Sequence, residues 1–152
     1  MTDSLTGLFN RRGWDSLLAA EEDRCSRYGH PAGIVVIDLD DLKKKNDEEG
    51  HGSGDLLLQE TALILRENLR NADIVARIGG DEFSVLAVEC NRLIANNMVE
   101  RLSNALDSKG IAASVGFGFR EPTGTLFDAF DVADKAMYER KRDRKQTLAV
   151  VD

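Results

Sequence analysis

Two adjacent acids, Asp81 and Glu82, directly follow two glycines, Gly79 and Gly80. Alternating and apolar stretches flank this group, so we expect two strands joined by a hairpin. Glycines at its turn would supply the positive φ that a tight hairpin needs. Carboxylates beside backbone that lacks Cβ atoms would also suit a hard cation with phosphate oxygens. An ordinary hairpin and a cation- and phosphate-binding turn are both open at this point.

A second acidic group, 38–41, follows a continuously apolar run over 32–37. That run is typical of a central strand buried on both faces, and open α/β sheets often place ligands just past strand ends. If this strand neighbours the hairpin strands, Asp38 converges with Asp81 and Glu82. Carboxylates from two elements can hold Mg²⁺ through contacts of about 2.1 Å, and such ions stabilise both the attacking and the leaving oxygens of phosphate chemistry.

Three polar residues between these groups could bind a nucleotide. Asn46 carries an amide and Asp55 a pure acceptor, a pair that would read the N1–H, N2–H₂ and O6 edge of guanine and reject adenine. Lys43 could hold a phosphate as a point charge.

Each of these features has a structural alternative. Asp55 could simply N-cap the helix that it begins, and 43–45 could be a solvated face. The basic cluster at 140–145 could be a charged helix end favoured by the dipole, and 70–73 a helix end meeting a strand. His51, in a glycine loop, is more typical of a hydrogen-bonding turn than of a catalyst.

The pattern of elements predicts an α/β (α+β) fold. Small residues on one face of 111–119 should admit close approach by another element, and three glycines over 50–54 should form a loop. The βαββαβ part fits a ferredoxin-like core, with a central, mainly antiparallel sheet flanked by helices and an extra peripheral helix and strand. The expected order is a helix N-capped by Asn10 and ended by Gly29, a strand at 32–37, a helix through 58–69, hairpin strands at 73–78 and 83–88, a helix through 94–105, a strand at 111–119, a helix from 126 and a last strand at 148–151.

Composition sets further bounds. With 152 residues, 42% of them hydrophobic, residues 1–152 should form a single domain with a real core. A net charge of −7 argues against non-specific nucleic-acid binding, so a triphosphate would need locally clustered Lys and Arg. Cys25 and Cys90, in a chain with no signal peptide and no apolar run of membrane length, indicate reduced thiols, a cytoplasmic location and no direct membrane insertion.

Taken together, the motifs resemble the GGDEF domain of diguanylate cyclases, named for the five letters at 79–83. The resemblance runs almost the whole length of the chain, and its order and spacing make it specific. The segments that carry it are 3–11, 38–40, 46–47 with 50–51, 54–55, 70–73, 79–83 and 133–138.

The resemblance implies an enzyme that condenses two GTP molecules into cyclic di-GMP and releases two pyrophosphates. The alternative is a non-catalytic module that binds GTP or cyclic di-GMP and passes a signal to a fused domain. By motif position, Mg²⁺ (or Mn²⁺) would bind Asp38, the Leu39 carbonyl and Asp81. Asp81 would also take the proton from the 3′-hydroxyl, with Glu82 supporting metal or phosphate.

Further roles follow from the same resemblance. The substrate contacts would be Asn46 and Asp55 for guanine, Lys43, Lys141 and Lys145 for phosphates, and Leu42. Arg70 and Asp73 match the family's RxxD inhibitory site for product, with Arg101 as a candidate second arginine.

Several positions depart from the family pattern, although the metal, base and guanine positions are intact. Lys45 and Glu49 could pair across a helical turn and so compensate each other. The departures are Leu42 for Phe, Lys45 for Ile, Glu49 for an aromatic residue, Arg144 for Gly, and Lys145 and Gln146 for Arg and Asn.

Assembly also follows from the implied reaction. One domain holds one set of site residues, enough for one GTP, so two domains should meet face to face as a transient homodimer. The domain should be a module of a longer signalling protein with a fused N-terminal sensor or dimerisation domain.

Overall fold

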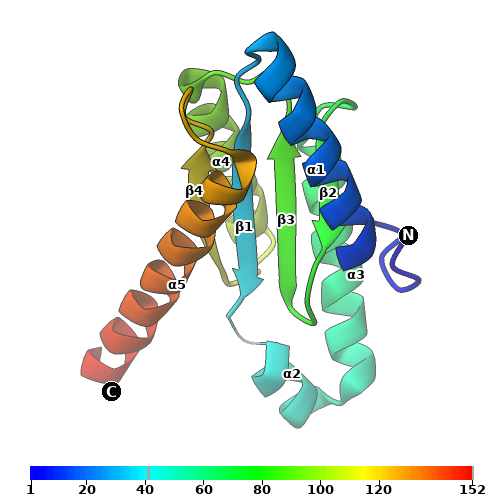
Figure 1. The fold of residues 1–152 in the computed structure, drawn as a ribbon. Helices are drawn as coiled ribbons and strands as arrows, with labels where there is room; N and C mark the ends of the chain where they lie inside the picture. Colours follow the sequence, from blue (N-terminus) through cyan, green and yellow to red (C-terminus); the bar gives the residue numbers. More distant parts are fainter. Residues whose placement is uncertain (41, 152) are drawn as a thin grey trace.

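The computed structural model describes residues 1–40 and 42–151, with side chains at all of these except 51 and 147–151. It is a four-stranded sheet covered by helices on both faces (Figure 1). The elements are α1 (Arg11–Tyr28), β1 (Gly33–Leu39), α2 (Leu42–Glu49), α3 (His51–Glu67), β2 (Ile74–Arg77), β3 (Glu82–Ala87), α4 (Arg92–Ser108), β4 (Ala113–Phe119) and α5 (Leu126–Val151). The strand order is β2-β3-β1-β4 with every pairing antiparallel, which confirms the predicted ferredoxin-like core.

Strand β1 is buried on both faces, as its continuous apolar run predicts. Ile34 and Val36 pack with α1 and α5, whereas Val35 and Ile37 pack with α3 and α4. All four side chains are fully buried, and each such burial is worth about 1.5–3 kcal/mol. The strand that ends in the acidic group is therefore held by apolar packing on both of its faces.

Helix α5 lies directly against β4, as the small face of that strand predicts. A Cβ atom on Gly116 would lie 2.0 Å from the Ala133 carbonyl oxygen, and one on Gly118 would lie 1.9 Å from that of Ala129. No larger residue fits at either position without moving the helix. This contact fixes the line of α5, whose C-terminal half extends past the end of β1 (Figure 1).

The caps of α1 also match their predictions. The Asn10 side chain accepts a hydrogen bond from the Gly13 amide at 2.9 Å, and Gly29 ends the helix with φ 73°. Of the helices that the structure describes, none is both long and apolar enough to cross a membrane.

The segment after β1 is more helical than predicted. The expected glycine loop is wrong, because only Gly50, with φ 90°, interrupts the chain between α2 and α3. Gly52 and Gly54 lie inside α3, although glycine costs about 1 kcal/mol in a helix. The N-cap alternative for Asp55 is also wrong, since the N-cap position belongs to Gly50. The backbone at His51 begins α3, and its side chain lies outside the described residues.

The predicted last strand at 148–151 is wrong as well, because α5 continues to Val151. A run of four apolar residues does not by itself distinguish a strand from a helix. No glycine or proline separates it from Leu126, so a helix that has already started propagates through it.

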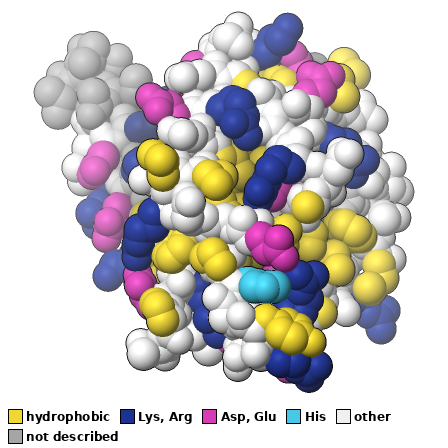
Figure 2. All heavy atoms as spheres, turned by 90° about the horizontal axis from the view of Figure 1, so that it is seen from above, with side chains coloured by type: hydrophobic (Ala, Val, Ile, Leu, Met, Phe, Trp, Pro, Cys, Tyr) yellow, Lys and Arg dark blue, Asp and Glu magenta, His cyan; other side chains and the backbone are white. Residues whose placement is uncertain are grey.

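The end of the molecule away from the hairpin carries no uniform charge. Figure 2 shows Lys and Arg side chains interspersed with Asp, Glu and hydrophobic ones over this face. Here Glu22 accepts hydrogen bonds from Arg120 at 2.8 Å and from the Leu126 amide at 2.7 Å, and so ties α1 to the start of α5.

Candidate active site

The β2–β3 hairpin ends in an open turn. The Ile78 amide donates to the Glu82 carbonyl at 2.9 Å, but neither Gly79 nor Gly80 has a φ in the left-handed region, so the expected positive φ is wrong. A Cβ atom built on Gly80 would have no atom within 4 Å. Gly80 therefore leaves room for a ligand beside the acids, whereas a Cβ atom on Gly79 would lie 3.3 Å from the Cβ of Glu82.

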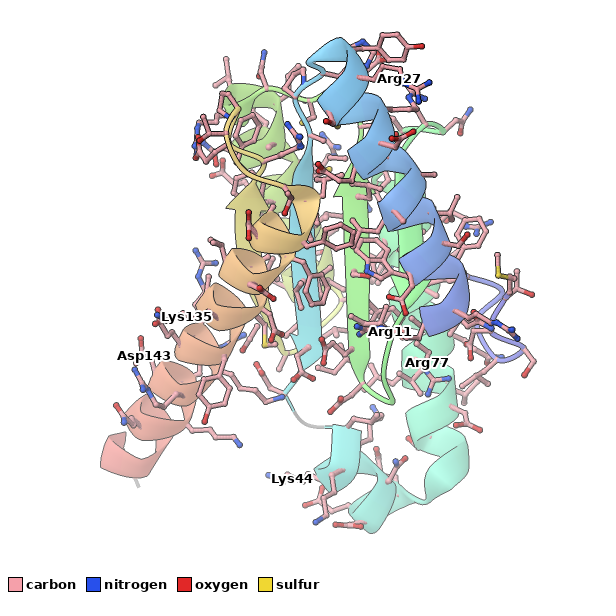
Figure 3. The ribbon with its side chains drawn as sticks, viewed as in Figure 1. Arg11, Arg27, Lys44, Arg77, Lys135 and Asp143 are labelled. Atoms are coloured by element: carbon pink, nitrogen blue, oxygen red, sulfur yellow. The ribbon has the colours of Figure 1, made fainter. Side chains whose placement is uncertain are left out.

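Arg77 holds the turn in place from β2 (Figure 3). Its guanidinium donates to the Gly80 carbonyl at 2.9 Å and pairs with Asp3 at 3.2 Å. Asp3 in turn accepts from the Thr6 amide at 3.0 Å, and these contacts lower its pKa despite its partial burial. Asp3, in the N-terminal segment, therefore helps to hold the hairpin turn through its contact with Arg77. The spacing of these residues along the chain does not reveal this contact.

The three acids converge as the sequence predicts. Asp38 lies directly opposite Glu82 in the β1–β3 register, and the Leu39 amide donates to the Asp81 carbonyl at 3.0 Å. Burial raises the pKa of Asp38; the hydrogen bond from Lys141 opposes that rise, and the Asp81 charge adds to it. Burial raises the pKa of Glu82 too, together with the charges of Asp134, Asp38 and Asp81. This concentration of negative charge favours a cation.

Lys141 supplies one such charge. Its ammonium lies 2.9 Å from Asp38 Oδ2 and donates to the Leu39 carbonyl at 3.2 Å. The family resemblance implies a phosphate role for Lys141, whereas in the structure its ammonium contacts two expected metal ligands.

Arg144 makes a second link from α5 to the end of β1. It pairs with Asp40 Oδ2 at 2.9 Å and donates to the Ala113 carbonyl, and Ser114 Oγ donates to Asp40 Oδ1 at 2.7 Å. Sequence reasoning placed Arg144 in the basic cluster at 140–145 and counted it as a departure from the family pattern, without a contact to Asp40. Its spacing of three residues from Lys141 is the signal that both side chains share a helix face.

The oxygen donors fit a divalent cation. Asp38 Oδ1 is buried and has no hydrogen-bond partner, which is the state of an oxygen that a cation would satisfy. Among the described side chains, no group of three or more His, Cys, Asp or Glu is arranged to hold a metal ion. A cation here would therefore need the Leu39 carbonyl and ligand oxygens, as Mg²⁺ sites with one or two carboxylates commonly do.

The expected guanine contacts lie at the corner between α2 and α3. Asn46 Oδ1 is buried without a hydrogen-bond partner, and a Cβ on Gly54 would lie 1.8 Å from it. Gly54 therefore positions Asn46, a role that sequence reasoning missed. Asp55 itself is exposed on α3.

The remaining substrate positions differ in burial. Lys43 and Lys145 are exposed, whereas Leu42 is half-buried and packs against the core formed with α3 and α4. The predicted pair of Lys45 and Glu49 is confirmed at 3.7 Å.

Arg70 and Asp73 close the turn between α3 and β2. The Arg70 guanidinium contacts Asp73 Oδ1 at 2.9 Å and the Val88 carbonyl at 2.8 Å, and the Asp73 carboxylate is fully buried. These contacts fit the structural alternative for 70–73, a helix end that meets a strand. The pair lies beside a cavity of about 240 Å³ that Arg70 and Arg66 help to line. Arg101 lies on α4 and donates to the Asn68 carbonyl at 2.9 Å, at a separate cavity.

The fold and the acidic strand end define a nucleotidyl-cyclase-like α+β domain. The family model described as "Diguanylate cyclase, GGDEF domain" matches residues 1–147, so the chain belongs to the GGDEF domain family.

Individual relatives agree with this assignment. Diguanylate cyclase DgcS of Shewanella oneidensis is 35% identical over 147 residues, which cover 93% of this chain and 49% of DgcS. The chain thus spans about half the length of that relative. The GGDEF domain of DgcB from Caulobacter crescentus, solved in complex with c-di-GMP, superposes with a TM-score of 0.87 at 27% identity, covering 93% of this chain and 90% of that one. A sensory box/GGDEF family protein from the same organism gives 0.83 at 34% identity, with 93% and 98% covered.

The raised pKa of Glu82 gives a stability prediction. The folded state binds this proton more tightly than the unfolded state, so stability falls as pH rises from the ordinary value of 4.5 through the raised pKa, and the full cost is present above it. Glu82→Gln removes this cost. We expect its Tm to exceed that of the wild type by about 1–4 °C at pH 8, with the gain vanishing near pH 4.

Scanning calorimetry across this pH range measures the effect. Glu139→Gln, at an exposed position of α5, is the matched control and should show no such gain. A Glu82→Gln variant that is no more stable than the wild type at pH 8 would contradict the charge-crowding account.

Proposed function

We propose that this domain is a diguanylate cyclase, which condenses two GTP molecules into cyclic di-GMP and releases two pyrophosphates. The observation that carries the proposal is the convergence of Asp38, Asp81 and Glu82 beside an open glycine turn. Two crowded carboxylates with raised pKa values and one unsatisfied buried oxygen suit a cation that brings phosphates with it. Membership of the GGDEF family supports the same reaction.

In each transfer, a 3′-hydroxyl oxygen forms a bond to an α-phosphorus, and the bond from that phosphorus to the pyrophosphate oxygen breaks. Asp81 would accept the hydroxyl proton, and the neighbouring Glu82 would support the metal or the phosphate. Asp38, Asp81 and the Leu39 carbonyl would hold Mg²⁺ or Mn²⁺, which when bound neutralises charge on the phosphates. Lys43, Lys141 and Lys145 would bind phosphate oxygens as mobile point charges.

Asn46 and Asp55 would read guanine from the α2–α3 corner. The Asn46 carbonyl oxygen is buried without a partner, so a guanine donor would satisfy it. Asn46 and Asp55 together would accept from guanine N1–H and N2–H₂, and adenine lacks both of these donors. Gly54 supports this role because it has no Cβ atom, and the Asn46 side chain occupies the space where that atom would lie.

A two-fold symmetric product needs two such half-sites. We therefore propose a transient homodimer in which each domain offers the 3′-hydroxyl of its nucleotide to the other's α-phosphate. In the intact protein, a fused sensor or dimerisation domain would control this encounter, and the cytoplasm would supply the GTP.

Cyclic di-GMP would also bind at Arg70 and Asp73, as an inhibitory product. The solved DgcB domain in complex with c-di-GMP shows that a relative of this fold binds that molecule. Because Arg70 and Asp73 are already paired, product binding would use the outward edge of the guanidinium rather than an unpaired charge.

Incubation with GTP and Mg²⁺ tests the activity. We expect cyclic di-GMP and pyrophosphate from the wild type, and loss of turnover by at least about a hundredfold in Asp38→Ala and Asp81→Ala. Specific activity should also rise with protein concentration, because two domains must meet.

Asp23→Ala, an exposed acid on α1 whose pair with Arg27 lies far from the hairpin, is the matched control. Wild-type turnover by Asp81→Ala would refute the mechanism. Binding of GTP and cyclic di-GMP with no turnover at any concentration would favour the non-catalytic module instead.

Base recognition gives the next prediction. Gly54→Ala should displace Asn46 and weaken GTP binding by about 5- to 150-fold, since each unmatched polar group costs about 1–3 kcal/mol, without weakening the poorer binding of ATP. Gly52→Ala, whose Cβ meets no atom within 4 Å, is the control. Calorimetry with non-hydrolysable analogues measures both, and equal GTP affinities in the two variants would remove the assignment.

The product site gives the last prediction of this group. Arg70→Ala should abolish calorimetric binding of cyclic di-GMP while GTP binding survives, with a thermal melt as the check on folding. Cyclic di-GMP binding that is unchanged in a folded Arg70→Ala protein would leave Arg70 with its structural role alone.

A further inference from the structure

Lys141 occupies a position that its expected role does not explain. Its ammonium contacts Asp38 Oδ2 at 2.9 Å and the Leu39 carbonyl at 3.2 Å, and its side chain is only 17% exposed. A lysine that served phosphate alone would have no need of a main-chain carbonyl. Its two partners belong to the proposed divalent-cation site.

The ammonium and a divalent ion cannot both make full use of these oxygens. An ion bound to Asp38 and the Leu39 carbonyl at about 2.1 Å would lie within about 5 Å of the ammonium, because both cations would contact the same atoms. The site is partly buried, so solvent and salt screen their repulsion only weakly.

The surrounding structure allows Lys141 to leave without moving its helix. Helix α5 is fixed against β4 at Gly116 and Gly118, and Arg144 holds it to Asp40 one turn further on. A lysine on a four-carbon stem changes its direction by side-chain rotation alone. Its release therefore costs one ion pair rather than a repacked core.

We infer that Lys141 is an internal cation that competes with the divalent ion for Asp38 and the Leu39 carbonyl, and that lowers the affinity of the nucleotide-free domain for that ion. The inference rests on the proposed function, because it needs the proposed cation site. Nucleotide phosphates that attract Lys141 would relieve the competition. Nucleotide and ion would then raise each other's affinity by the same factor, as linkage requires.

Binding of Mn²⁺ to the nucleotide-free domain tests this inference directly, by electron paramagnetic resonance and without turnover. Lys141→Met should bind Mn²⁺ about tenfold more tightly than the wild type, whereas Lys141→Arg, which keeps the charge, should stay weak. Lys135→Met is the matched control, because Lys135 is exposed on the same helix and points away from the sheet (Figure 3).

A second titration with a non-hydrolysable GTP analogue separates the possible failures. With the analogue bound, the advantage of Lys141→Met over the wild type should shrink to within about twofold. Equal or weaker nucleotide-free Mn²⁺ binding by Lys141→Met overturns the competition while leaving the proposed function intact. Absence of Mn²⁺ binding by every protein, even with the analogue, overturns both.

Discussion

The antiparallel register of β1 with β3 is the constraint on which the site depends. It sets Asp38 opposite Glu82 and brings the Leu39 amide to the Asp81 carbonyl, so the acids meet because two strands pair. The ladder is central, and the side chains from Ile34 to Ile37 are fully buried in the cores on both faces of β1, so a shift of register would require both cores to repack. The core thus supplies the energy that holds these acids together, against the burial and the mutual repulsion that raise the pKa values of Asp38 and Glu82.

A second constraint acts from the other face of the sheet. The absence of side chains at Gly116 and Gly118 lets α5 approach β4 until helix carbonyls meet the strand. That approach directs the C-terminal half of the helix over the end of β1, where Lys141 and Arg144 reach Asp38 and Asp40. Small residues remote from the chemistry therefore decide where two positive charges of the site lie.

Much of this arrangement could be predicted from the sequence, because local patterns encoded it. The apolar run at 32–37 predicts a strand buried on both faces, and the small face of 111–119 predicts the close approach of another element. The structure shows both. The approach of Gly54 to Asn46 could not be predicted, since it joins two helices across a corner. The contact of Lys141 with Asp38 could not be predicted either, because the sequence identifies a positive side chain but not which of several acids it will contact.

The corner that carries Asn46 differs from the rest of the domain in one respect. None of the residues of α2 is fully buried, and a single glycine with positive φ, Gly50, links this short helix to α3. Little free energy therefore opposes its local unfolding, compared with the sheet that holds the acids. The proposed base recognition would therefore lie on a weakly protected helix, whereas the proposed phosphate chemistry would lie at the end of a buried strand. If nucleotide binding orders this corner further, the entropic cost would fall on the choice of base rather than on the alignment of the reacting groups.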